Sequence, residues 1–186
     1  AVDLARFWSR RIRRLLPAAL VTIAGVAVYG WLFASDVQRV GLRGDLLATL
    51  FYAANWRFLA EGTSYADLQG GQSLVLHFWS LAIEEQFYVL WPLLAALVLA
   101  RWGRRGLSAA TSALAVGSVA ACLAVWDGST EALDRIYFAT HTRAAEILVG
   151  AGLALLVPMT GSRRLPRGAD RTLRLAGPVG LVVLVG

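Results

Sequence analysis

The chain has 186 residues, of which 58% are hydrophobic and 16% are charged, and its mean hydropathy is +0.59. A soluble domain is usually about half apolar and about a quarter charged, and the apolar residues here fall in long runs, so the composition excludes an ordinary soluble domain. The net charge is +6, but the basic residues, all of them Arg, form short clusters beside apolar runs. This placement indicates anchoring at a membrane surface and not nucleic-acid binding.

Six apolar segments follow one another, and they predict an all-α fold, a polytopic transmembrane helix bundle. Four of them have the length of a membrane span: residues 15–34, 74–100, 107–126 and 136–158. Residues 175–186 look like a further span that is cut off, so we expect the sequence to be a piece of a longer protein.

The remaining segment, residues 45–60, is short and carries Asn55 and Arg57. It is predicted to be a short or re-entrant helix, which is tolerated at membrane depth where protein buries it. The alternative is that it spans the bilayer and that one loop breaks the charge rule.

The charge of the loops orients the segments. Residues 1–14, 101–106 and 159–174 are rich in Arg, whereas residues 61–73 and 127–135 carry a net negative charge. Because Arg clusters resist translocation, the three positive stretches are predicted to be cytoplasmic and the two negative ones to lie outside.

Two adjacent carboxylates, Glu84 and Glu85, interrupt the apolar run 74–100. Ionisable groups at membrane depth are costly and usually line a pathway. On a helix, His77, Glu84 and Tyr88 share one face, so Glu84 near mid-bilayer and His77 near the outer end are the candidate catalytic residues. The simpler alternatives are that the carboxylates pair with an Arg of a neighbouring helix and that His77 is an interfacial polar residue.

Arg143 and Glu146 are three residues apart on one helix face. They form either a self-contained salt bridge or part of a substrate site, because a buried guanidinium is a good anion clamp. Arg143 and Glu84 are predicted to differ in depth by only about 5 Å. We therefore expect an ion pair, or a shared substrate, between these two side chains.

Arg11 and Arg14 lie on one helix face at the predicted cytoplasmic mouth. Guanidinium groups at this spacing can bind phosphates bidentately, although plain membrane anchoring would also explain them. The sequence has one cysteine, no metal-ligand spacing, no glycine-rich phosphate loop and no nucleophile elbow. No metal and no bound cofactor are expected.

At these three clusters the sequence resembles the acyltransferase-3 family of integral membrane proteins, which move acyl groups onto glycans. The resemblance rests on residues 7–17, which contain the paired Arg11 and Arg14. It rests also on residues 77–88 with the following Pro92, the most specific match, and on residues 142–150.

The resemblance implies an O-acyltransferase of the cell (inner) membrane, multi-pass, with acyl-CoA as co-substrate and a cell-surface or lipid-linked glycan as acceptor. Arg11 and Arg14 would take the donor phosphates, and Glu84 and Arg143 would shape the path within the membrane. The family's catalytic His lies on a helix upstream of the paired arginines, where it would act as base toward the acceptor hydroxyl. Since nothing before Ala1 supplies it, we expect this piece alone to be inactive.

Two other classes stay open on the residues alone. A membrane transporter or flippase would use the buried Glu84 and Arg143 as a proton or substrate path without covalent chemistry. A purely structural membrane subunit would have little use for Glu84.

Overall fold

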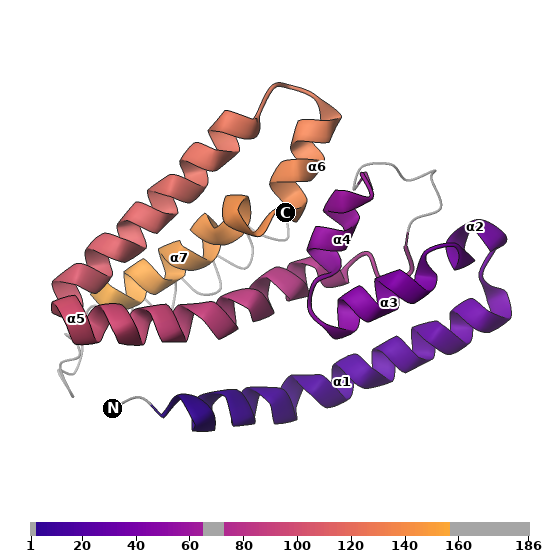
Figure 1. The fold of residues 1–186 in the computed structure, drawn as a ribbon, viewed down its shortest axis with the longest axis horizontal. Coiled ribbons are helices and arrows are strands. Elements are labelled where there is room, and N and C mark those ends of the chain that lie inside the picture. The colour runs from indigo at the N-terminus through magenta and orange to yellow at the C-terminus, as the bar shows by residue number, and fades with distance from the viewer. Residues whose placement is uncertain (1–2, 65–72, 157–186) are drawn as a thin grey trace, which may run out of the picture. The chain divides into compact units, whose positions relative to one another are not determined.

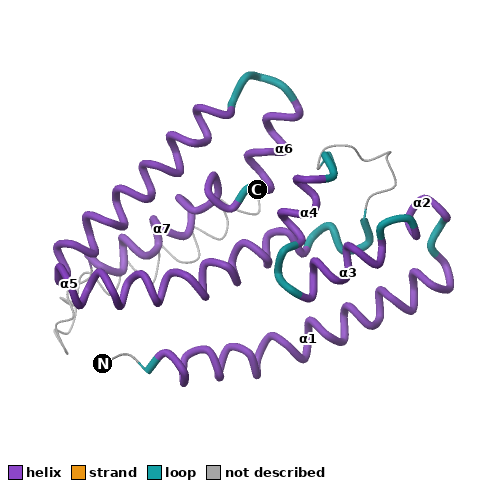
Figure 2. Tube along the Cα trace, viewed as in Figure 1, coloured by secondary structure: helices purple, strands orange, loops and turns teal. Residues whose placement is uncertain are grey.

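The computed structural model describes residues 3–64 and 73–156. All regular elements in these residues are helices, which confirms the all-α prediction (Figures 1 and 2). They are α1 (Leu4–Phe33), α2 (Asp36–Arg39), α3 (Leu42–Leu50), α4 (Ala54–Ala60), α5 (Phe78–Val125), α6 (Thr130–Phe138) and α7 (Thr140–Leu156). The predicted segment 175–186 and the loop 159–174 lie outside the described residues.

Helices α1 and α5 are long and apolar enough to cross a membrane. Many of their large apolar side chains are exposed, among them Val21, Leu90 and Val116. A soluble protein would bury a long apolar helix against its own core, whereas lipid can cover these side chains. The chain is thus part of a helical membrane protein.

The residues predicted as two spans, 74–100 and 107–126, lie mainly in α5, which consists of two helical parts that meet at a kink at Gly103. Gly103 has φ 64° and ψ −166°, a backbone conformation that is essentially restricted to glycine. The bend divides α5 into a first limb, which ends at this glycine, and a second limb that follows it. Whether each limb crosses the bilayer stays a prediction.

The segment 45–60 contains parts of two short helices, α3 and α4, joined by a turn. In that turn Tyr52 has φ 53°, a left-handed conformation that is uncommon for a residue other than glycine. Neither helix is long enough to cross a bilayer alone. The segment 136–158 is likewise interrupted, because the chain leaves α6 at Ala139 and starts α7 at Thr140.

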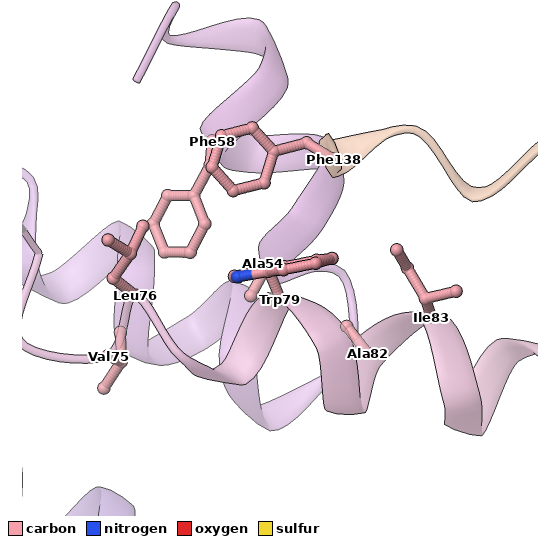
Figure 3. Close-up of a cluster of buried hydrophobic side chains, with 8 residues drawn as sticks. All are labelled: Ala54, Phe58, Val75, Leu76, Trp79, Ala82, Ile83 and Phe138. Atoms are coloured by element: carbon pink, nitrogen blue, oxygen red, sulfur yellow. The ribbon is translucent and has the colours of Figure 1, made fainter. Parts of the chain in front are cut away.

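The buried core lies where α4, α5 and α6 meet. Phe138 of α6 packs its ring against Phe58 of α4 and against Trp79 of α5, with centroids 5.9 and 5.7 Å apart (Figure 3). Residues of the turn before α5 and of its first limb complete the cluster, which consists of Ala54, Phe58, Val75, Leu76, Trp79, Ala82, Ile83 and Phe138. This core fixes which face of α5 points toward α4 and α6.

The opposite side of the first limb of α5 meets α1, and α1 and this limb run antiparallel (Figure 1). The Trp8 indole donates a hydrogen bond to the carbonyl of Tyr88 (3.0 Å), near the start of α1. Near its other end, Gly30 lies against Leu42 and Leu74, and a Cβ at this glycine would clash with Leu42. The N-terminal end of α1 therefore lies on the same side as the end of the first limb of α5.

Candidate functional site

A cavity of about 690 Å³ opens between α1 and the first limb of α5. We call it the basic cavity; its lining is Phe7, Arg10, Arg11, Arg14 and Leu15 of α1 and Leu81, Glu84 and Tyr88 of α5. The three α5 residues are spaced three and four apart, so they fall on one helix face. The three arginines of α1 lie within about one helical turn, on the face toward α5. The structure thus brings together Arg11, Arg14 and Glu84, three of the residues that the sequence singled out.

Arg11, which lines the basic cavity, forms a close ion pair with Glu85, which is not among the lining residues of that cavity. Arg11 Nη2 lies 2.6 Å from Glu85 Oε1, and Arg11 Nε donates to both carboxylate oxygens at 3.1 Å. The guanidinium also lies on the ring of Tyr88, 3.2 Å from its centroid. The Glu85 side chain is only 12% exposed and the Arg11 side chain 24%, so Glu85 has the interhelical Arg partner that the simpler interpretation allowed.

The other charged groups of the cavity are exposed. Within the described residues no ion pair involves Arg10, Arg14 or Glu84, and all three side chains are exposed. Two guanidinium groups and one carboxylate are therefore available to a bound molecule, which favours an anionic ligand that also offers a hydrogen-bond donor.

A set of polar side chains lies next to this ion pair, where the first limb of α5 meets α4 and α7. Asn55, which is 0% exposed, donates to the Phe138 carbonyl (2.9 Å) and to Thr140 Oγ1 (3.0 Å). Gln86 donates to Asn55 Oδ1 (2.9 Å) and to the carbonyl of Tyr52 (2.8 Å), and accepts from the Thr140 hydroxyl (2.7 Å).

These bonds join α4, the first limb of α5 and the start of α7. We call Asn55, Gln86 and Thr140 the polar cluster. The sequence signalled it only weakly, through an amide beside Glu84 and Glu85 in an apolar run and an Asn in the short segment 45–60. Nothing in the sequence indicated that these amides meet.

The expected ion pair between Glu84 and Arg143 is wrong, whereas a substrate shared by the two side chains stays a prediction. Arg143 Nη1 pairs with Glu146 Oε1 at 2.7 Å on its own helix, and its guanidinium lies near the rings of Trp79 and Tyr137. The prediction used depth alone, but Glu84 faces α1 whereas Arg143 is on the side of the aromatic core. Similar depth on different faces of the bundle does not make a contact.

His77 is exposed and immediately precedes α5. It lies seven positions before Glu84, about 10 Å along a helix, and it is not among the described residues that line the basic cavity. Arg143 and Glu146 also lie outside this cavity. The roles expected for these three residues stay predictions.

Glu84 and Arg14 were expected at different depths, one near mid-bilayer and the other at the cytoplasmic mouth. They line one cavity, so they lie closer together than those two depths suggest. Charge clusters report which side of the membrane a segment is on, but they carry no information about how two helices are shifted along each other. No group of three His, Cys, Asp or Glu residues in the described part of the chain could hold a metal ion.

The chain is similar to known proteins over its whole length. It is 38% identical to YrhL of Bacillus subtilis over 186 residues, covering 99% of this chain and 29% of that protein. It is 35% identical to the peptidoglycan O-acetyltransferase OatA of Listeria monocytogenes, covering 100% of this chain and 30% of the relative. It is 33% identical to the O-acetyltransferase OatA of Staphylococcus aureus, covering 84% of this chain and 26% of that protein.

The chain therefore spans less than a third of the length of these relatives. No protein-family model matches it, and no solved structure matches it significantly.

Proposed function

The chain belongs to the O-acetyltransferase family of these relatives, and we propose that it is the donor-binding part of a membrane enzyme that acetylates peptidoglycan. The observation that carries this proposal is the basic cavity, in which Arg10 and Arg14 have no ion-pair partner within the described residues. The complete protein would be a multi-pass protein of the cell membrane, since α1 and α5 are both apolar enough to span.

The proposed acetyl donor is an acyl-CoA. Its phosphates are anions that guanidinium groups bind through parallel, charge-assisted hydrogen bonds. Arg10 and Arg14 offer such donors on one turn of α1, and Arg11 lies between them in the sequence. The proposed acceptor is a hydroxyl of the glycan, as the name of the Listeria relative indicates.

The proposed transfer forms an ester bond between the glycan oxygen and the acetyl carbon while the carbon–sulfur bond of the thioester breaks. The hydroxyl proton leaves through a base and ends on the thiolate of CoA. Glu84 is the carboxylate of the basic cavity that has no ion-pair partner in the described part of the chain. We assign it to contact with the reacting groups, where it orients the acceptor hydroxyl or accepts its proton.

A variant of the complete protein tests donor binding. Arg14→Ala should weaken acyl-CoA binding about tenfold or more, because a hydrogen bond to a charged group contributes roughly 1.5–3 kcal/mol. The control is Arg13→Ala, because Arg13 bonds to Ser9 on the same helix and does not line the basic cavity. Titration of the purified protein with CoA measures both.

Equal CoA affinity in the parent protein and in Arg14→Ala would mean that these arginines only anchor the protein at the membrane.

The rival function, a transporter or flippase, can be distinguished by the product of the reaction. Acetylated glycan made from acetyl-CoA by the complete protein supports the transferase, whereas substrate movement without acetylation supports transport.

A further inference from the structure

Glu85 does more than neutralise Arg11, as the geometry of the pair indicates. The carboxylate engages Nε and Nη2 of Arg11, so Nη1 makes no hydrogen bond to Glu85. The ring of Tyr88 lies 3.2 Å from the guanidinium carbon and fixes the plane of the group. Arg11 is thus held in one orientation while it still has donors for a ligand.

The position of the Glu85 carboxylate depends on Gln86, the next residue of α5. Gln86 belongs to the polar cluster and bonds to Asn55, to Thr140 and to the carbonyl of Tyr52. These bonds tie the residue next to Glu85 to α4, to α7 and to the turn before α4, so they fix the rotation of α5 at the point where Glu85 bonds to Arg11.

We propose that Glu85 is a positioning residue for the donor: it holds Arg11 so that the remaining guanidinium protons line the basic cavity. This inference rests on the proposed function. It predicts that the reach of the residue 85 side chain matters more for donor binding than its negative charge.

Reach and charge can be separated by two conservative variants of the complete protein. Glu85→Gln keeps the side-chain length, and its Oε1 can still accept from both Nε and Nη2, as Oε1 of Glu85 does now. Glu85→Asp keeps the charge but shortens the side chain by one methylene. If Glu85 positions Arg11, the shorter side chain of the Glu85→Asp variant should be unable to hold Arg11 in place.

The measurement is the KM for acetyl-CoA and kcat in acetyl transfer, together with the yield of folded protein. We expect Glu85→Asp to raise the donor KM about tenfold, the size of one charge-assisted contact. Glu85→Gln should keep KM within about threefold of the parent or lower it, because the cavity becomes more positive. Glu131→Asp is the control, since Glu131 forms an exposed ion pair with Arg135 on α6.

Several results would overturn the proposal. An unchanged KM in Glu85→Asp, or an equal rise in both variants, would mean that Glu85 does not act through the position of Arg11. A lower folded yield with unchanged KM would assign it to folding alone. If Arg14→Ala weakens donor binding but Glu85→Asp does not, only the positioning role fails; if neither does, the proposed donor site fails as well.

Discussion

Glu84 and Glu85 are adjacent in the sequence, yet the structure gives them different surroundings. Glu85 is paired with Arg11 and largely buried, whereas Glu84 is exposed at the basic cavity. Successive residues of a helix point about 100° apart, so two neighbouring carboxylates meet different partners. The sequence predicted that acids within an apolar run need a role, but it could not say which neighbouring helix carries the matching Arg.

Asn55 offers a test at the same scale. It is fully buried and makes three hydrogen bonds within the polar cluster and to the Phe138 carbonyl. Asn55→Ala should reduce the free energy of unfolding by about 1–3 kcal/mol, because buried polar groups on the partner residues lose their bonds. Thermal unfolding of the detergent-solubilised protein measures the loss.

Thr22→Ala is the matched control, since the Thr22 hydroxyl bonds only to the Ala18 carbonyl of its own helix at an exposed position. A midpoint for Asn55→Ala equal to that of the control would show that the polar cluster contributes little to stability.

Among the elements, α5 shows what a hydropathy pattern leaves open. The charged stretch 101–106 interrupts the apolar run and was interpreted as a loop between two spans. In the structure the two limbs of α5 follow each other directly, because a single residue, Gly103, absorbs the change of direction. Hydropathy detects the loss of apolar character, but it cannot distinguish a loop from a bend made by one glycine.

Replacement of Gly103 tests the bend. Gly103→Ala should destabilise the protein by about 1–3 kcal/mol, because φ 64° with ψ −166° is strained for any residue with a Cβ. The space is open, since no atom lies within 4 Å of a Cβ built there, so the effect is one of backbone conformation alone. Gly25→Ala in α1 also meets no atom within 4 Å and lies in a regular helix.

Gly25→Ala is therefore the control, and its effect on stability should be neutral or stabilising by up to about 1 kcal/mol. Thermal unfolding of the two variants side by side gives the difference. Equal midpoints would contradict a strained glycine-specific bend.

At the scale of the whole molecule, composition was sufficient for the fold class, because long apolar runs leave few alternatives to a helical membrane protein. The shift of one helix along another was not predictable, since it depends on contacts between residues about 75 positions apart, such as Arg11 with Glu85. The contact between Arg11 and Glu85 also determines how far the basic cavity lies from the bend at Gly103. Glu85 precedes Gly103 by 18 residues, about 27 Å along the helix.

This separation is close to the thickness of the hydrocarbon core, roughly 30 Å. The arginines of the basic cavity therefore lie far along α5 from those beside the bend, and a donor that enters from the side of the bend has to reach deep into the bundle. Arg10, Arg11 and Arg14 therefore form a group separate from the arginines beside the bend.

Cysteine labelling of intact cells tests the orientation on which this depth depends. The residues beside the bend, 101–106, carry three Arg and should be cytoplasmic, whereas Ser129 follows the second limb of α5 and should lie outside. In a Cys122→Ser background, which keeps a donor for the Thr142 carbonyl, an impermeant thiol reagent should label Ser129→Cys. It should label Arg105→Cys only after the cells are broken. Labelling of Arg105→Cys in intact cells would reverse the orientation, and the basic cavity would then have to take its donor from the side opposite to the one proposed.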